Sequence, residues 1–425
     1  MKFKFLFLFL FLFFISCSSK NNELLVDINS FKNQGKQIFF KDSIEDSKEI
    51  FKILSINLDN KINNNSINSK NYSFNEFKLN KYGSFSHNKY NNYQKKILVL
   101  KNYLYFVDDN GLLNILSLLG KNKKKIQIYP KKQVKGYAVK FYIIENNNYV
   151  YIADSLGGIH AYDTINSKIK WKFNLGVPFL SNLVFYKNNL YISNVNGKIF
   201  SFSALDGNQN WSYETGSGYI KTENAFKISI KNDILIFSNN LKDLTCIDLQ
   251  NKRLLWTKSL LPYKIVSNQN FFEFSDIIIN QKNLIIFTSD NNLFNLDLYT
   301  GDINWKKDLS FSKKIQDNND YLLFVGLDGF FKILNKKNNT VIFSLNLKKY
   351  INDKNNKKFL EINNILIINK NIFLTSTDGD FYKISTQNLK NVYYKKITKN
   401  ISSNIIIYDK FLYFTGDYKY LYSLN

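Results

Sequence analysis

Few residues in this sequence carry side chains that could perform chemistry. It has two cysteines, Cys17 and Cys246, and two histidines, His87 and His160. Two cysteines cannot form a disulfide scaffold, and His87 in a polar segment and His160 in an expected strand do not make up the ligand set of a metal site. There is no Gly-rich phosphate loop, no G-x-S-x-G motif and no Cys/His dyad. Cys246 lies on an alternating strand and is expected to be a small buried residue, so no catalytic residue, metal or cofactor is predicted.

Cys17 is the one side chain with a predicted modification. Lys2 and Lys4 precede an apolar run of 11 residues, Phe5 to Ile15, which suits the apolar region of a signal peptide and is too short to span a bilayer. The run ends in Phe14-Ile15-Ser16-Cys17, which resembles the bacterial lipobox. That resemblance implies that residues 1–16 are removed and that the Cys17 thiol carries a lipid. An Asp directly after the cysteine would resemble a retention signal for the inner membrane. This sequence has Ser18 at that position, which favours the outer membrane. An ordinary signal peptide with a chance cysteine is the alternative.

Residues 17–70 are expected to be a lipidated N-terminus followed by a mobile tether. The segment is rich in Asn, Ser and Lys, and such a composition cannot bury enough apolar surface to fold alone. It contains two short apolar islands, Gln37–Phe40 and Ile50–Leu58, which could pack against the fold.

The net charge of +24 is spread over the chain. The basic side chains are almost all Lys, with Arg253 as the one Arg. Proteins that bind nucleic acid cluster their basic residues and favour Arg for bidentate contacts. The composition therefore argues against nucleic-acid binding. Attraction to an acidic surface is physically reasonable at this charge.

The stretch from Asn283 to Leu309 shows the repeat on which the rest of the chain is built. It reads as three strands with alternating apolar positions, separated by turns at Asp290–Asn292 and Thr300-Gly301, a pattern typical of antiparallel hairpins. Each of the four tryptophans lies eight residues after an aligned position. These pairs are Asp163 and Trp171, Ser203 and Trp211, Asp248 and Trp256, and Asp297 and Trp305. The same step from Asn335 and Ser385 reaches Phe343 and Tyr393.

Eight units can be aligned between residues 71 and 425. The aligned residues are Ser117, Asp163, Ser203, Asp248, Asp297, Asn335, Ser385 and Asn425. Their spacing is that of four-stranded propeller blades, so the predicted fold is an all-β, eight-bladed β-propeller. Hairpins such as Asn110-Gly111 and Asp378-Gly379 suit type I′ turns.

The last unit ends at Asn425, before its outer strand. A strand over Ser73–Leu79, with Phe77 at the aromatic position, is therefore expected to complete the last blade. Closing the ring in this way would remove exposed sheet edges.

The pattern Ala-x-Asp-x-x-x-Gly-x-x-x-Trp resembles the tryptophan-docking repeat of quinoprotein-type β-propellers. Its clearest copies are Asn295–Trp305 and Ala161–Trp171, which depart at Asn295 and Ser167. The resemblance implies that Trp171, Trp211, Trp256 and Trp305 pack between blades, and that Phe343, Tyr393 and Phe77 hold the same position. One branch of this family contains dehydrogenases that use pyrroloquinoline quinone, and another contains the BamB lipoproteins of the outer-membrane β-barrel assembly machine. The lipobox, short tether and eight units resemble the BamB branch.

A BamB-type chain would be a non-enzymatic scaffold anchored to the outer membrane and facing the periplasm. The resemblance implies that its partners are the periplasmic domains of the barrel-forming subunit, other assembly lipoproteins and nascent outer-membrane proteins. In this branch a loop with Leu and Arg residues engages the barrel-forming partner. The matching segment here, residues 261–274, lacks Arg, and Phe271 and Phe272 are its apolar candidates, although they could equally begin the next strand.

Two other functions fit the same fold. One is a degenerate quinoprotein oxidoreductase, which would need hard oxygen ligands for Ca²⁺ and an Asp base, and no carboxylate cluster or long insertion stands out. The other is a propeller that binds polysaccharide or peptidoglycan, which would show as aromatic side chains gathered on one rim.

Overall fold

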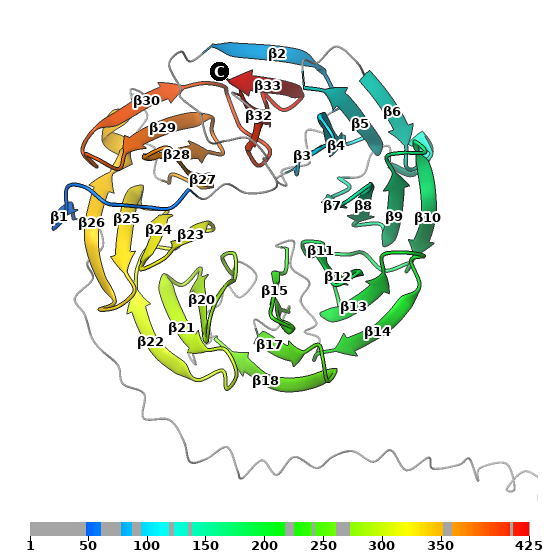
Figure 1. Cartoon of the computed structure of the whole chain (residues 1–425), viewed down its shortest axis with the longest axis horizontal. Helices are drawn as coiled ribbons and strands as arrows, with labels where there is room; N and C mark the ends of the chain where they lie inside the picture. The colour runs from blue at the N-terminus through cyan, green and yellow to red at the C-terminus, as the bar shows by residue number, and fades with distance from the viewer. Residues whose placement is uncertain are drawn as a thin grey trace, which may run out of the picture. The chain divides into compact units, whose positions relative to one another are not determined.

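Eight antiparallel sheets surround a central axis in the computed structural model (Figure 1). The structure describes residues 48–60, 78–86, 95–118, 123–134, 138–216, 225–239, 243–260, 273–351, 359–408 and 411–424. The eight-bladed all-β propeller predicted from the repeats is confirmed. Within those ranges, no helix is long and apolar enough to cross a membrane.

Each blade has four strands, and the first strand of the blade lies nearest the axis (Figure 1). Blades 1 and 2 consist of β3 (Leu98–Leu100), β4 (Tyr103–Val107), β5 (Leu112–Ser117), β6 (Lys123–Gln127), β7 (Phe141–Asn146), β8 (Tyr149–Asp154), β9 (Gly158–Asp163) and β10 (Lys168–Asn174). Blades 3 and 4 consist of β11 (Val184–Tyr186), β12 (Asn189–Ser193), β13 (Lys198–Ser203), β14 (Gln209–Glu214), β15 (Ile228–Lys231), β16 (Ile234–Ser238), β17 (Asp243–Asp248) and β18 (Arg253–Ser259).

The remaining blades follow the same plan. Blades 5 and 6 consist of β19 (Ile278–Asn280), β20 (Asn283–Thr288), β21 (Asn292–Asp297), β22 (Ile303–Asp308), β23 (Ile315–Asn318), β24 (Tyr321–Val325), β25 (Phe330–Asn335) and β26 (Thr340–Asn346). Blade 7 consists of β27 (Ile362–Ile368), β28 (Asn371–Ser376), β29 (Asp380–Ser385) and β30 (Val392–Lys396), and blade 8 of β31 (Ile406–Tyr408), β32 (Phe411–Gly416), β33 (Tyr420–Leu424) and β2 (Leu79–Ser84). Short helices α1 (Lys131–Val134) and η4 (Leu347–Tyr350) lie in connections between blades.

Burial follows the position of a strand within its blade. The second and third strands, such as β8 and β9, are buried along nearly their whole length, whereas the outer strand β10 alternates between exposed and half-buried residues. Blades stack face to face, so a middle strand is covered on both faces and reads as a continuous apolar run. The hydrophobic clusters accordingly lie between neighbouring blades.

Two kinds of hairpin connect the strands. At turns such as Asn110-Gly111 and Asp378-Gly379 only the glycine has positive φ, whereas a type I′ turn needs positive φ at both central residues. The type I′ prediction for these turns is therefore wrong. Four of the described two-residue turns between first and second strands do have positive φ at both positions, for example Lys187-Asn188 and Asn232-Asp233. Asn and Asp tolerate the left-handed conformation.

An N-terminal strand closes the ring, as predicted, but at a different register. Strand β2 pairs with β33 over Leu79–Ser84, and Asn80, not Phe77, stands at the position that Trp171 holds opposite Ala161, facing Ser423. Tyr82 packs between blades 8 and 1, and its hydroxyl lies 3.0 Å from Ser423 Oγ. Burial of Tyr82 accounts for this register, because a shift of one residue would turn it outward. Phe77 lies outside the described residues.

Residues 48–60, which we call the strap, cross from blade 6 to blade 7. Strand β1 (Ile50–Phe51) adds a fifth strand to the outer edge of blade 6, with Phe51 opposite Phe343. Further along, Ile56 N donates to Thr386 O, and Leu389 N donates to Leu54 O. Ile53, Ile56 and Leu58 pack against the cluster between the two blades. The second apolar island of the N-terminal segment therefore lies against the propeller.

Candidate functional site

Tryptophans join consecutive blades at the outer edge of the ring. Trp256 on β18 is buried, and its indole Nε1 donates to Leu298 O of blade 5 at 3.0 Å. A Cβ at Gly301 would lie 2.7 Å from the Trp256 ring, so the ring rests directly on the backbone of that glycine. Trp171 makes the same contacts with Ala204 O, at 3.2 Å, and with Gly207 of blade 3. In these two repeats the glycine thus receives the tryptophan of the preceding blade.

The other aromatic residues at this position differ in burial. Trp211 and Trp305 are half-buried and pack against clusters that include the next blade, where Lys252 and Asn339 take the place of the glycine. Phe343 is fully buried between blades 6 and 7. Tyr393 holds the aligned position on β30 but is 41% exposed. These aromatic positions account for packing and offer no reactive group.

The remaining candidate groups are buried or lie outside the described residues. Burial raises the pKa of the Cys246 thiol to about 12, which leaves it unreactive. His160 is buried, and its Nε2 lies 3.2 Å from Tyr129 Oη, whose hydroxyl donates to Asp154. The described residues contain no group of three or more His, Cys, Asp or Glu side chains that could hold a metal. Cys17, His87, Phe271 and Phe272 lie outside the described ranges.

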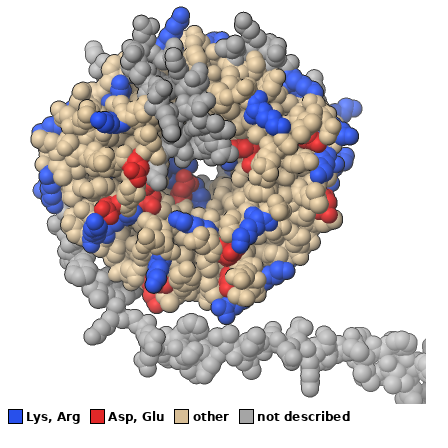
Figure 2. Space-filling view, viewed as in Figure 1, with Lys and Arg blue, Asp and Glu red and all other residues tan. Residues whose placement is uncertain are grey.

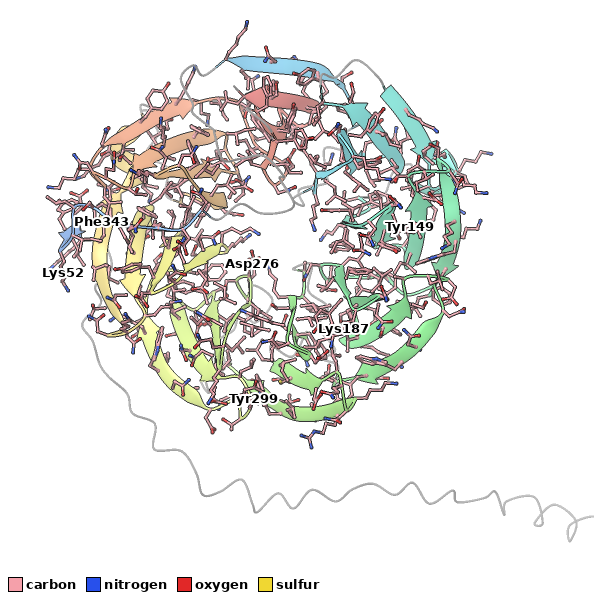
Figure 3. All side chains as sticks on the ribbon, in the orientation of Figure 1. Lys52, Tyr149, Lys187, Asp276, Tyr299 and Phe343 are labelled. Carbon is pink, nitrogen blue, oxygen red and sulfur yellow. The ribbon has the colours of Figure 1, made fainter. Side chains whose placement is uncertain are left out.

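A polar ring surrounds one mouth of the central channel. Each blade contributes one residue, immediately before an apolar residue at the start of its inner strand. The ring consists of Lys96, Lys140, Asn182, Lys227, Asp276, Lys314, Asn364 and Asn404. These residues line a cavity of about 1110 Å³, whose walls also include Phe141, Ile143 and Ile315. Figure 3 shows Asp276 at the central opening, whereas Tyr299 and Phe343 lie far out on their blades.

The asparagines of the ring bind the backbone of the next blade. Asn182 accepts a hydrogen bond from Ile228 N at 2.8 Å and donates to Ile228 O at 2.9 Å. Asn404 does the same with Ile97, across the closure between blades 8 and 1. Asn364 accepts from Ile405 N at 3.0 Å. An amide offers both a donor and an acceptor, so it can satisfy both backbone groups where two inner strands meet.

The charged members of the ring pair on one side of the channel. Asp276 bridges Lys227 and Lys314, at 2.9 and 2.7 Å. Burial opposes the negative charge, but the two lysines outweigh it and hold the pKa of Asp276 well below its usual range. Behind the ring, Lys313 lies between Glu273 and Glu361, and these carboxylates overcome the effect of burial and raise its pKa.

The ring has a net charge of +3, from four lysines and one aspartate. Figure 2 shows basic and acidic side chains around the central opening, in the view of Figure 1. A positively charged mouth with apolar walls suits a ligand that carries both negative and apolar groups.

Sequence reasoning did not identify this ring, although the repeat contains a signal for it. In seven of the eight units a polar residue followed by Ile or Leu stands 21 residues before the aligned position, as Asp276 stands before Asp297. In blade 2 the residue 21 before Asp163 is Tyr142, and Lys140 lies two residues earlier. Four of the eight positions are Lys, which is common throughout the chain, so composition hides the pattern.

Comparison with solved structures finds proteins of similar fold. It is similar to the crystal structure of BamB from Moraxella catarrhalis, with 14% identity, a TM-score of 0.62, and coverage of 82% of this chain and 100% of that one. It is also similar to the computationally designed protein Ika8 (10% identity, TM-score 0.59, 80% and 98% covered) and to the C-terminal WD40 domain of Sif2 (11% identity, TM-score 0.57, 82% and 98% covered). At these identities the likeness is one of fold.

A sequence-family comparison identifies the family. The family described as outer membrane protein assembly factor BamB matches residues 143–394, from blade 2 through blade 7. The chain belongs to this BamB family. Comparison with curated proteins finds no match.

Proposed function

We propose that this protein is a non-enzymatic scaffold of outer-membrane β-barrel assembly. The observation that carries the proposal is the family match, which spans six consecutive blades of a closed eight-bladed ring. The scaffold docks onto periplasmic domains of the barrel-forming subunit and acts beside other assembly lipoproteins while nascent outer-membrane proteins insert. It uses no cofactor and binds no nucleic acid.

The face that carries the polar ring is the docking face in this proposal. The connections that lead from one blade to the next emerge on it, because every ring residue stands at the start of an inner strand. Phe271 and Phe272 lie outside the described residues and remain the apolar candidates for this docking. Loops held by a rigid scaffold are a common place for partner binding.

An affinity purification tests the docking. The tagged protein, purified from detergent-solubilised membranes of its own source, is expected to carry the barrel-forming subunit with it. Charge reversal on the ring face, Lys227→Glu with Lys314→Glu, should reduce that recovery. The matched control is Lys187→Glu with Lys337→Glu, at the opposite end of the strands. This control should leave the recovery of the barrel-forming subunit unchanged. Recovery that is absent, or reduced equally by both variants, contradicts the docking proposal.

Attachment to the outer membrane is part of the same proposal and depends on Cys17. Cys17→Ala should abolish labelling by a fatty-acid analogue and release the protein from the outer-membrane fraction, because several acyl chains anchor stably where one does not. Labelling that persists in the variant would refute this anchor.

The enzyme alternative has a direct test. Purified protein is mixed with pyrroloquinoline quinone and Ca²⁺, and we expect no bound chromophore and no oxidation of alcohols or sugars. Turnover under these conditions would replace the scaffold by a quinoprotein oxidoreductase.

A further inference from the structure

The outer strand of blade 6 differs in composition from the outer strands of the other blades. Strand β26 reads Thr-Val-Ile-Phe-Ser-Leu-Asn and has no charged residue. At least one Lys, Arg, Asp or Glu stands on each of the other seven outer strands, which are β2, β6, β10, β14, β18, β22 and β30. A charged side chain on an edge strand hinders pairing with a strand of another molecule. Blade 6 therefore lacks a protection that the other seven edges have.

Ile342 shows this difference at a single position. It stands one residue before the aromatic residue of the repeat, where blades 2, 3 and 5 have Lys170, Asn210 and Asn304, all exposed to solvent. Ile342 is only 9% exposed, because it packs in the cluster between blades 6 and 7, to which the strap also contributes side chains. On blade 6 the strap thus covers an apolar position that is polar and open to solvent in those other blades.

Residues 49–52, which we call the strap tip, hold the edge of β26 with few contacts (Figure 1). Only two residues of the tip, Ile50 and Phe51, pair with β26, which has seven residues. Lys52 N adds one hydrogen bond to Ile342 O, at 3.0 Å. The Phe51 side chain stays 37% exposed. The tip therefore fills only part of the hydrogen-bonding edge that β26 offers.

The ion pair of the strap tip lies at the surface. Glu49 pairs with Lys349 at 2.7 Å, and its carboxylate accepts a hydrogen bond from Asn346 N at 3.2 Å. The Lys349 side chain is 58% exposed, and such an ion pair contributes little to stability because water and salt screen it. Residues 53–60, by contrast, pack three apolar side chains into the cluster between blades 6 and 7. The tip can therefore lift while the rest of the strap stays in place.

An uncovered β26 edge fits the same edge of a second copy of this chain. Two copies related by a twofold axis present the same strand to each other, and antiparallel pairing then makes every contact twice. No charge opposes this pairing, because β26 has none, whereas pairing β10 or β22 with itself would bring lysines together. We propose that the blade 6 edge is a self-association site that the strap tip keeps covered, and that two copies pair through β26 when the tip lifts.

Light scattering during size-exclusion chromatography tests the pairing by measuring molecular mass. The protein is purified in detergent, and the mass of bound detergent is subtracted. In the released variant, Glu49→Lys with Lys52→Pro, a cation stands beside Lys349 and the amide that donates to Ile342 O is removed. The tip should therefore lift, and the released variant should have twice the mass of the unchanged protein at the same concentration.

A charge on the edge tests whether β26 is the strand that pairs. Ile342→Lys, added to the released variant, puts like charges on two facing strands and should restore the mass of the unchanged protein. The matched control, Asn210→Lys, adds the same charge at the corresponding position of blade 3 and should leave the dimer intact. Far-UV circular dichroism shows whether each variant is folded.

A peptide competitor covers the case in which the Ile342→Lys variant does not fold. A peptide with the sequence of residues 48–60, added to the released variant, should occupy the edge of β26 and halve the measured mass. A peptide of the same composition in scrambled order should leave the mass unchanged. Hydrogen exchange gives a second measurement, because the β26 amides of the released variant should exchange more slowly in the dimer than after dilution to the monomer.

A released variant that stays monomeric would overturn the proposal. A dimer that Ile342→Lys and Asn210→Lys affect equally would do the same, since the pairing would not involve β26. Masses beyond that of a dimer would show that the edges of several blades pair, and they would contradict a single site. Recovery of the barrel-forming subunit by affinity purification is a separate result, because neither Lys227 nor Lys314 belongs to β26.

Discussion

Replacing Trp256 by Ala tests the physical basis of the ring most directly. The side chain is 9% exposed, its Nε1 donates to Leu298 O at 3.0 Å, and its ring rests on Gly301. Truncating a packed Trp costs about 3–5 kcal/mol, and loss of a hydrogen bond costs about 1 kcal/mol. We therefore expect Trp256→Ala to lower the free energy of unfolding by about 5 kcal/mol, a large share of the ~5–15 kcal/mol of a typical domain.

Two further variants test how much of that loss comes from packing and how much from the hydrogen bond. Trp256→Phe keeps most of the packing and loses the hydrogen bond, so it should cost about 1–2 kcal/mol. Trp171→Ala removes a half-buried indole with a longer hydrogen bond of 3.2 Å, so it should cost less than Trp256→Ala. Urea unfolding is followed by far-UV circular dichroism, because tryptophan fluorescence would itself change with these substitutions.

Hydrogen exchange shows where the damage lies. Blades depend on their neighbours for stability, so exchange should accelerate in both blade 4 and blade 5 of Trp256→Ala, while blade 8 keeps its protection. The reasoning fails if Trp256→Ala costs less than about 1 kcal/mol, or if blade 5 is unaffected. A variant that folds normally and loses its partner would make Trp256 a binding residue.

Three further predictions concern the ring, the closure and the strap. Because the pKa of Asp276 is depressed, its contribution to stability is present above about pH 4 and is lost as the pH falls below that value. The Asp276→Asn variant should therefore lose less thermal stability in acid than the unchanged protein does. At pH 7 the substitution should cost less than about 1 kcal/mol, since the side chain is 39% exposed. Tyr82→Ala should cost about 2 kcal/mol and accelerate hydrogen exchange in β31–β33 first, and unchanged exchange there would refute the role of Tyr82 in closing the ring. Ile56→Asp should release the strap and expose the edge of β26 to exchange while the eight blades remain folded; loss of the entire fold would show instead that the strap is needed for closure.

The number of blades and the location of most strands could be predicted because they depend on local pattern. Within one unit, apolar alternation, a turn and an aromatic residue eight positions further on specify hairpins before any tertiary contact forms. Trp171, Trp256 and Phe343 could be assigned to the packing for the same reason. The closing strand was foreseen from the missing strand of the last unit, but its register was not, because Tyr82 had no counterpart in the aligned motif.

The eight repeats and the all-β class were thus determined by the sequence alone. Only the tertiary structure decided which residues meet across blades: Gly301 under the Trp256 of the preceding blade, the strap beside Phe343, and eight polar residues gathered at one mouth of the channel. The physical reason is the range of the interactions. Strand pairing within a blade joins residues near in sequence, whereas the channel mouth forms only when the last blade closes against the first, and ring closure brings together groups that no local pattern connects.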